Sequence, residues 1–272
     1  MASHCGCGGA KTLSNHGAVQ RAALRPAARP PRTRLACSAS GGASSSTSSG
    51  TAGAGSYRPL VKVCGVTNAA DAEVAARAGA NFIGMIMWPK AKRAVSDETA
   101  SAIAATAARH GALAVGVFVD EDAATIAARC GRAGIPVAQL HGDGARAALG
   151  GLPERLQVVY VLHADQSGQI LTGLPDCGRA PEWLLVDGQQ GGSGQAYDWS
   201  NLRPPAGAAR GWLLAGGLHP GNVADAVAAT RPGGVDVSSG VCGPDGLRKD
   251  AGKVEAFVAA ALGAAPADGG AR

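Results

Sequence analysis

Two side chains capable of acid–base chemistry each end a short apolar run and precede a glycine. Cys64 ends the run LVKVC before Gly65, and Asp187 ends the run WLLVD before Gly188. A thiol becomes a base when its pKa falls towards neutrality, and a carboxyl group becomes a proton donor when its pKa is raised. These residues therefore predict a base and an acid. The alternatives are a buried structural cysteine and a turn-forming aspartate.

Two glycine-rich segments near the end of the chain, AGGLHPGNV and DVSSGV, each precede a possible helix start. Backbone N–H groups at a helix start attract anions, and phosphate binds to such segments in many barrel enzymes. The pair therefore predicts a phosphate site, with ordinary turn chemistry as the alternative.

Basic side chains follow another apolar run, in the segment WPKAKRAVS, which holds Lys90, Lys92 and Arg93. A planar guanidinium suits a carboxylate because it can donate two parallel hydrogen bonds. The alternative is a solvated basic loop.

Two further polar residues are candidates for the site. His141 in QLHG could touch a ligand or satisfy a backbone carbonyl group, and we favour the second interpretation. Asp236 in GVDVS is a further candidate site residue.

Eight short apolar runs predict strands buried on both faces. They lie at 59–64, 81–87, 113–119, 137–140, 156–162, 183–187, 211–215 and 234–238. Amphipathic stretches separate most of them, among them AADAEVAARAG after Asn68, DEDAATIAARCGRAG, and GNVADAVAATRPGG with Asn222 or a neighbour as its cap. This alternation predicts a single α/β domain folded as a (β/α)8 TIM barrel, with a doubly wound open sheet as the alternative. In a barrel, the polar residues named above would all lie at the carboxyl ends of strands.

The first 57 residues differ in composition from the rest of the chain. They hold no acidic residue, are rich in Ser and Ala, and carry six basic residues that account for the net charge of +5. This composition predicts a disordered plastid transit peptide and linker over 1–57, the barrel domain over 58–265, and a disordered tail over 266–272. The expected location is the chloroplast stroma, with the mitochondrion or the cytoplasm as alternatives. The near-neutral body argues against a nucleic-acid partner, and no apolar run is long enough for a membrane span.

Several strings, taken in order, resemble the phosphoribosylanthranilate isomerase family over about residues 59–262. They are KVCGVTN, GMIMWPKAKRAVS, VGVFVDE, AQLHGD, LLVDGQQGGSGQAYDWS, LLAGGLHPGNV and GVDVSSGV. The resemblance implies an isomerase of tryptophan biosynthesis that performs an Amadori rearrangement of a small phosphorylated substrate. It implies no cofactor and no metal.

The resemblance also implies a role for each site residue. Asp187 is the acid at the ribose ring oxygen, Cys64 is the base at C2, and Arg93 holds the anthranilate carboxylate. The phosphate loops contain Gly216, Gly217, Ser239 and Gly240. The chain is expected to be a monomer or a homodimer, and transient contact with other enzymes of tryptophan biosynthesis is left open.

Two positions depart from the family pattern. Ala91 stands where the family often has Ser, and Cys242 stands where it often has Glu.

Two rival functions remain: another phosphate-binding barrel enzyme, and a catalytically inactive barrel used for docking. The histidine-pathway isomerase uses Asp at the end of its first strand, so Cys64 argues against it. A turnover assay separates the inactive barrel from an enzyme.

Overall fold

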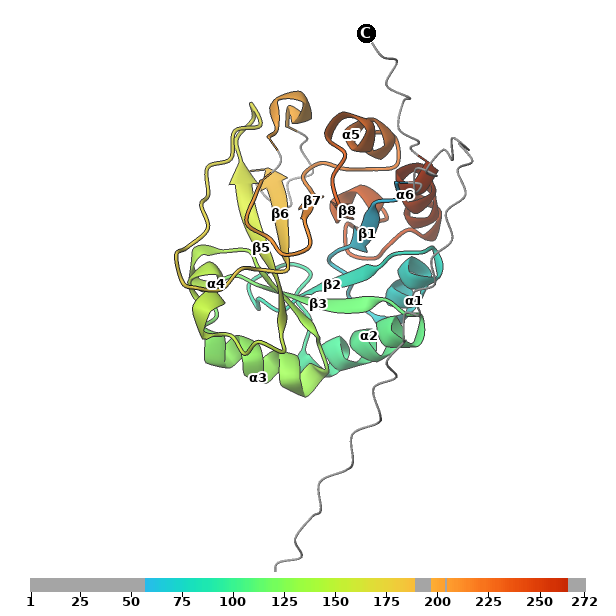
Figure 1. The fold of residues 1–272 in the computed structure, drawn as a ribbon. Helices are drawn as coiled ribbons and strands as arrows, with labels where there is room; N and C mark the ends of the chain where they lie inside the picture. Colours follow the sequence, from blue (N-terminus) through green and yellow to red (C-terminus); the bar gives the residue numbers. More distant parts are fainter. Residues whose placement is uncertain (1–56, 189–196, 204, 264–272) are drawn as a thin grey trace, which may run out of the picture. The chain divides into compact units, whose positions relative to one another are not determined.

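The computed structural model of the chain describes residues 57–188, 197–203 and 205–263. Its eight parallel strands form a closed barrel in sequence order, with β8 beside β1 (Figure 1). This confirms the TIM barrel over the open sheet. The strands are β1 Leu60–Val63, β2 Phe82–Ile86, β3 Leu113–Phe118, β4 Val137–Leu140, β5 Gln157–Ala164, β6 Trp183–Gly188, β7 Trp212–Leu214 and β8 Gly234–Val237. The predicted outer boundaries at 58 and 265 stay predictions, because residues 1–56 and 264–272 lie outside the described residues.

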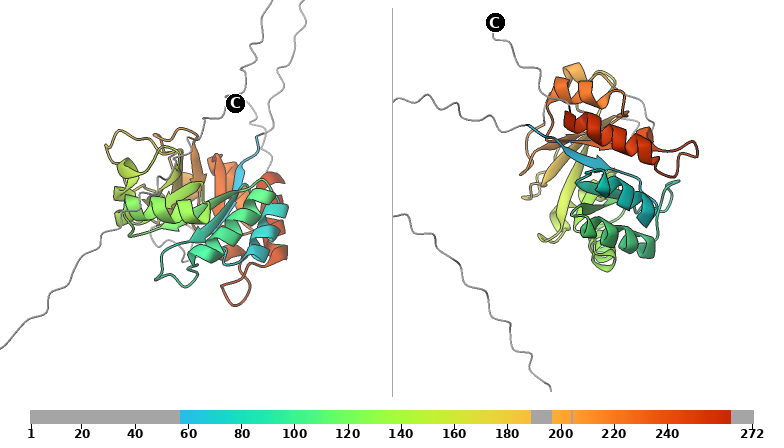
Figure 2. Two further views of the ribbon diagram at one scale, coloured as in Figure 1. Left: turned by 90° about the horizontal axis from the view of Figure 1, so that it is seen from below. Right: turned by 90° about the vertical axis from the view of Figure 1, so that its right-hand side faces the viewer.

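Helices surround much of the barrel, and Figure 2 shows α1, α2 and α6 packed along one side of it. The helices are α1 Ala69–Arg77, α2 Asp97–Arg109, α3 Ala123–Ala133, α4 Asp143–Ala147, α5 Val223–Thr230 and α6 Ala251–Gly263. Three 3-10 helices accompany them: η1 Leu149–Gly151, η2 Trp199–Asn201 and η3 Ser239–Val241. Residues 165–182, between β5 and β6, contain no helix. The alternation of strand and helix is therefore regular only up to β4 and again from β7.

Side-chain caps explain where three of the helices begin. Asn68, Ser96 and Asp122 each accept a hydrogen bond from the backbone N–H group three residues later, at α1, α2 and α3 respectively. Asn222 is the N-cap residue of α5, as predicted, but its side chain makes no capping hydrogen bond. Its Oδ1 accepts from the N–H group of His219 and its Nδ2 donates to the Gly217 carbonyl group, so the side chain turns back towards β7 instead of capping α5.

The barrel interior has an apolar lower layer and a polar upper layer. One cluster of buried side chains draws on alternate positions of six strands, as expected for residues that point inwards. It contains Phe82, Val115, Val137, Val159, Val161, Trp183, Leu185, Leu213 and Ala215. Further along the strands the inward positions are buried polar residues: Lys62, Gln139, Asp187 and Asp236. Chemistry is therefore confined to the carboxyl end of the barrel.

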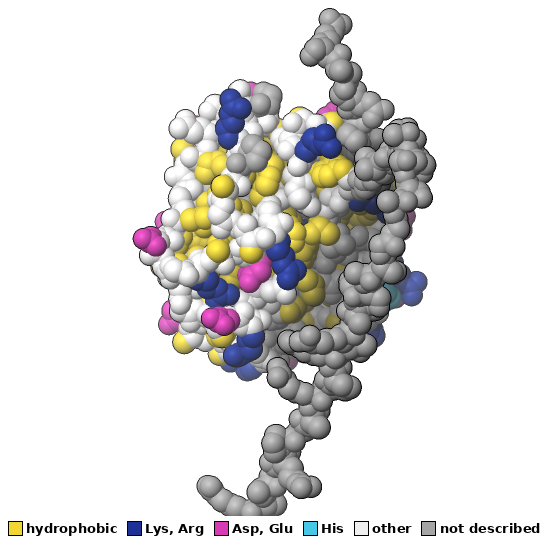
Figure 3. Space-filling view, viewed as in Figure 1, with side chains coloured by type: hydrophobic (Ala, Val, Ile, Leu, Met, Phe, Trp, Pro, Cys, Tyr) yellow, Lys and Arg dark blue, Asp and Glu magenta, His cyan; other side chains and the backbone are white. Residues whose placement is uncertain are grey.

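The outer surface carries charges of both signs. In Figure 3, the basic and acidic side chains on the face shown are interspersed with apolar and neutral ones. Among the described residues, no helix is both long enough and apolar enough to cross a membrane.

Candidate active site

A buried ion pair lies beneath the candidate acid and base. Lys62 on β1 is paired in register with Asp236 on β8, and the Lys62 Nζ donates to Asp236 Oδ1 at 2.9 Å. Lys62 is fully buried and Asp236 is 8% exposed. Burial lowers the pKa of Lys62, but the Asp236 carboxylate and then Cys64 raise it, so the net pKa lies above the ordinary value. The pairing with Asp236 therefore favours the charged form of Lys62 inside the barrel.

Asp187 ends β6 in a small pocket that it shares with Asp236. Burial, followed by repulsion from the Asp236 carboxylate, raises the pKa of Asp187 to about 7, while the Gly188 N–H group and Lys62 oppose the rise. The Gly188 N–H group donates to Asp187 Oδ1 at 2.8 Å. A carboxyl group with this pKa is protonated in a substantial fraction of molecules near neutral pH and can donate its proton. Residues 189–196 of the glycine-rich loop after it lie outside the described residues.

Cys64 follows β1 and is buried at the adjoining side of the mouth. Its N–H group donates to the Val237 carbonyl group at 2.8 Å, and its own carbonyl group accepts from Ser238 Oγ at 3.2 Å. Its sulfur lies over Gly84 of β2, where an added Cβ atom would be 2.8 Å from Sγ. The sulfur therefore fills the space that the missing side chain at Gly84 leaves.

Arg93 reaches back from the loop between β2 and α2 to the end of β1. Its guanidinium packs against Gly65, near the hydroxyl group of Ser238, and its Nη1 lies 3.8 Å from Cys242 Sγ. Lys90 in the same loop is exposed and lies 3.8 Å from Asp120. Of these two cations, only Arg93 is placed beside Cys64.

The two predicted phosphate loops pack against each other. Gly216 and Gly217 have positive φ angles of 89° and 65°, which glycine adopts without strain. Gly240 lies so close to the Leu218 carbonyl group and to His219 that a side chain on it would overlap them. Ser239 begins η3 and is exposed. Gly216, Gly217 and Ser239 line the same pocket as Asp187, which brings the phosphate candidates and the candidate acid together.

His141 lies beside a second histidine that the sequence analysis did not single out. The rings of His141 and His163 meet edge to face with centroids 5.4 Å apart. Burial, and then His163, Lys62 and Arg146, lower the pKa of His141 to about 4, so its ring is neutral. The expectation that this ring satisfies a backbone carbonyl group fails at Nδ1, which is buried and has no hydrogen-bond partner among the described residues. Arg146 Nη1 instead donates to the His141 carbonyl group at 2.9 Å.

Lys62 is a further residue that the sequence analysis missed, although a signal was present. It is a lysine within the apolar run LVKVC, two residues before Cys64. Residues two apart on a strand point to the same side, so the alternation alone places Lys62 on the inward face with Cys64. Its partner Asp236 was only a secondary candidate.

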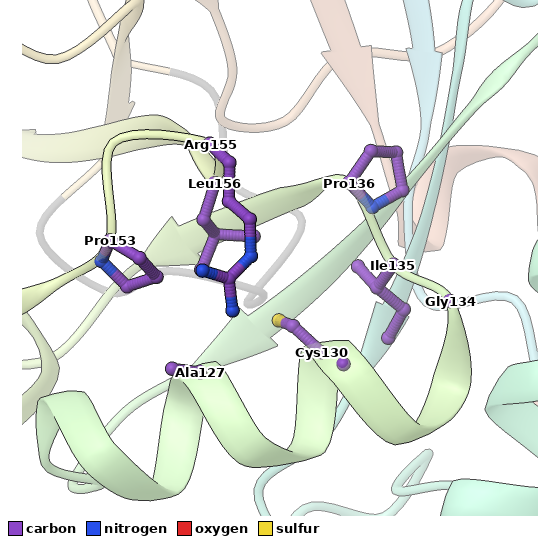
Figure 4. A pocket seen from close by; sticks show the side chains of 9 residues that line it. Ala127, Cys130, Gly134, Ile135, Pro136, Pro153, Arg155 and Leu156 are labelled. Carbon is purple, nitrogen blue, oxygen red and sulfur yellow. The ribbon is translucent and has the colours of Figure 1, made fainter. Parts of the chain in front are cut away.

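A separate cavity of about 240 Å³ lies at the amino ends of β4 and β5 (Figure 4). Cys130 of α3, Pro136, Pro153 and Arg155 are among the residues that line it. Burial raises the pKa of Cys130 to about 12, so this thiol is not a usable base near neutral pH. The cavity is at the opposite end of the strands from Cys64 and Asp187.

A comparison with known families covers almost the whole of the barrel. Residues 61–260 match the family described as N-(5'-phosphoribosyl)anthranilate isomerase. The chain belongs to this family.

Individual members of the phosphoribosylanthranilate isomerase family are similar over most of the chain. The chloroplastic N-(5'-phosphoribosyl)anthranilate isomerase 1 of Arabidopsis thaliana is 47% identical over 209 residues, which is 76% of each protein. A dimeric family member from Thermotoga maritima, solved as engineered monomers, is 28% identical with a TM-score of 0.58, covering 75% of this chain and 99% of that one. A family member solved with reduced 1-(o-carboxyphenylamino)-1-deoxyribulose 5-phosphate is 29% identical with a TM-score of 0.59, over the same shares of the two chains.

Proposed function

We propose that the chain converts N-(5-phosphoribosyl)anthranilate into 1-(2-carboxyphenylamino)-1-deoxyribulose 5-phosphate, with Asp187 as the acid and Cys64 as the base. Family membership supports the activity. The observation that carries the assignment is the buried Asp187 carboxyl group, with a pKa of about 7, in one pocket with Gly216, Gly217 and Ser239. An acid and a phosphate cradle are thus adjacent, as a phosphorylated sugar requires.

In the first step, Asp187 protonates the ring oxygen of the ribose. The C1–O bond then breaks, its electron pair stays on the oxygen as a hydroxyl group, and the anilino nitrogen forms an imine with C1. Asp187 can do this because burial and Asp236 raise its pKa, so that a substantial fraction of the molecules carry the proton near neutral pH. The reaction opens the furanose without cleaving any carbon–carbon bond.

In the second step, Cys64 as a thiolate removes the proton from C2. The electron pair of the C–H bond moves to form the C1–C2 double bond, and the imine nitrogen is neutralised. The resulting enolamine tautomerises to the 2-ketone of the product.

The remaining site residues bind the two charged ends of the substrate. Arg93 is proposed to hold the anthranilate carboxylate, and Gly216, Gly217, Ser239 and Gly240 the phosphate through backbone N–H groups. A small phosphorylated molecule is also what the family member cited above holds in its crystal structure.

The test is a fluorescence assay that follows the loss of phosphoribosylanthranilate with purified residues 58–272. Turnover that is saturable in substrate and inhibited by the reduced product analogue supports the proposal. Soluble, folded protein without turnover would support the docking alternative instead.

Location and assembly are further proposals. The similar Arabidopsis protein is chloroplastic, and we propose that residues 1–57 likewise deliver this chain to the plastid stroma. Fusion of residues 1–57 to a fluorescent reporter tests this, and cytosolic or purely mitochondrial fluorescence contradicts it.

Sedimentation of the purified barrel distinguishes a monomer from a homodimer, the state named for the Thermotoga relative.

A further inference from the structure

Basic side chains from two parts of the barrel meet at Cys242. Its sulfur lies 3.8 Å from Nη1 of Arg93, in the loop after β2, and 3.4 Å from Nζ of Lys249, just before α6. Its backbone carbonyl group accepts a hydrogen bond from Nζ of Lys253 at 2.9 Å. Cys242 and Lys249 are both buried, at 4% and 8% exposure. A single residue therefore contacts three basic side chains, and two of them share its sulfur.

The two basic side chains that share the sulfur have no acidic partner. Among the described residues, no carboxylate forms an ion pair with Arg93 or Lys249. Every acidic residue of the chain except Asp268 is among those described. Asp71 accepts from the backbone N–H group of Lys249 at 2.9 Å, but its ion pair is with Arg248. The cluster therefore lacks a counter-ion.

The Lys249 side chain is held in place by uncharged acceptors. Its Nζ donates to the Ser238 carbonyl group at 2.8 Å as well as to the Cys242 sulfur, and Lys249 and Cys242 are also paired as an isolated antiparallel bridge. Burial, and to a smaller extent the Arg93 guanidinium, lower the pKa of Lys249. A buried ammonium group beside a second cation is stabilised when an anion joins the site.

We propose that Lys249 is a second cation of the carboxylate subsite, behind Arg93, and that the carboxylate of the substrate is the counter-ion that both side chains lack. The inference rests on the proposed role of Arg93. Lys249 acts on the bound carboxylate through its charge and by holding Cys242 against the guanidinium, so it does not need to touch the substrate. Cys242 determines specificity in this arrangement, because a carboxylate side chain at this position would pair with the cations before the substrate arrives.

The test uses two ligands that differ in one charge. One is the reduced product analogue, which carries the carboxylate, and the other is its carboxamide counterpart, in which that group is neutral and of the same size. Isothermal titration calorimetry gives the preference for the carboxylate as the ratio of the two dissociation constants. Both ligands carry the phosphate, so a variant that only loosens the mouth or the phosphate loops weakens both alike and leaves the ratio unchanged.

The first pair of variants changes the charge at the shared sulfur. Cys242→Glu and Cys242→Gln introduce side chains of equal size, and only the first supplies a carboxylate. The preference for the carboxylate ligand is expected to be lower in Cys242→Glu than in Cys242→Gln by about 10-fold or more. Because the two variants differ only in charge, crowding of the buried position affects both.

The second pair of variants changes Lys249 itself. Lys249→Met removes the charge and is expected to lower the preference for the carboxylate by about 10-fold, whereas Lys249→Arg keeps the charge and should retain most of the preference. The matched control is Lys253→Met, one turn along in α6. Lys253 is exposed and donates only to a backbone carbonyl group, so water screens its charge and the ratio should not change.

The possible results separate the inference from the proposed function. Equal ratios in Cys242→Glu and Cys242→Gln would overturn the inference, as would a wild-type ratio in folded Lys249→Met. Weaker binding of inorganic phosphate and of both ligands alike in Lys249→Met would assign this residue to the phosphate loops instead. If the wild-type chain does not turn over phosphoribosylanthranilate, the proposed function fails, whereas a carboxylate preference that depends on the charge of Lys249 would still support the subsite.

Discussion

The guanidinium of Arg93 lies against Gly65, the residue that directly follows Cys64. Gly65 has a φ angle of 71°, and any side chain on it would overlap the guanidinium. Arg93, the proposed carboxylate-binding residue, can therefore lie next to Cys64, the proposed base, because Gly65 has no side chain. With Arg93 in its proposed role, the aromatic end of the substrate would lie on the β1–β2 side of the mouth.

Replacing Arg93 with Ala is expected to raise KM by roughly 10- to 100-fold, the equivalent of a hydrogen bond to a charged group. The carboxylate is present in both ground and transition states, so kcat should change much less. Lys90→Ala is the matched control, because it removes an exposed cation from the same loop. Steady-state kinetics decide the matter: an unchanged KM for Arg93→Ala is incompatible with the assigned role.

Replacing Cys64 with Ser is expected to lower kcat by at least about 10²-fold, because a hydroxyl group is a far weaker base than a thiol. The variant should fold normally and bind the reduced product analogue, since the phosphate loops are untouched. Cys177→Ser changes an exposed thiol and serves as the control. Near-normal kcat in Cys64→Ser would make the thiol structural and direct attention to the neutral ring of His141.

Asp187→Asn keeps the size of the side chain and removes the transferable proton. Loss of general acid action is expected to lower kcat by at least about 10²-fold, with binding of the product analogue retained. Rapid-quench or fluorescence kinetics on the purified variant measure the loss. If this variant were active, Asp187 would be reduced to a residue that shapes the turn after β6.

The same substitution should stabilise the folded protein at neutral and alkaline pH. Because the pKa of Asp187 is about 7 in the fold against an ordinary value of 3.8, the folded state binds more protons than the unfolded state between these values. The stability contributed by this group therefore falls as pH rises from about 4 to about 7.

Denaturant unfolding of the wild type and of Asp187→Asn at about pH 4 and about pH 8 tests this expectation. The two proteins should be similar in stability at the lower pH. At the higher pH the variant should be more stable, by on the order of a few kcal/mol. The lowered pKa of His141 has the opposite effect, because the stability that it contributes is lost as pH falls. Both proteins contain His141, so this effect cancels in the comparison. Equal stabilities at both values would contradict the raised pKa.

Gly240→Ala is expected to weaken phosphate binding, because its new side chain would collide with the Leu218 carbonyl group and push the two loops apart. A displacement of this kind should raise KM and the dissociation constant of inorganic phosphate by roughly 10- to 100-fold. Gly243→Ala is the matched control in the next turn, where a Cβ atom has its nearest neighbour at 3.8 Å. Equal effects of the two substitutions would argue against a close packing of the phosphate loops.

The strands could be predicted from sequence because each is a short apolar run buried on both faces, as Leu213 and Leu214 illustrate. All eight predicted runs overlap a strand. The positions of Cys64 and Asp187 followed, since a barrel places the ends of its strands at one mouth.

Contacts between distant segments could not be predicted in the same way. Asn222 has the residue type and position of a helix cap, but the Gly217 carbonyl group and the His219 N–H group compete for its side chain. The packing of Arg93 on Gly65 and of Arg146 on His141 depends on loop conformations that no periodicity encodes. Strand alternation places Lys62 on the inward face, but its pairing with Asp236 could not be predicted, because the two residues are 174 positions apart.

That separation has a consequence for how the chain reaches its native state during synthesis. Lys62 leaves the ribosome long before Asp236, so every shorter nascent chain carries an ammonium group without its carboxylate. An unpaired charge of this kind opposes burial, and β1 has no β8 to pair with until the last strand emerges. The barrel therefore cannot close until β8 has been synthesised, and until then the edge of β1 that pairs with β8 has no strand beside it.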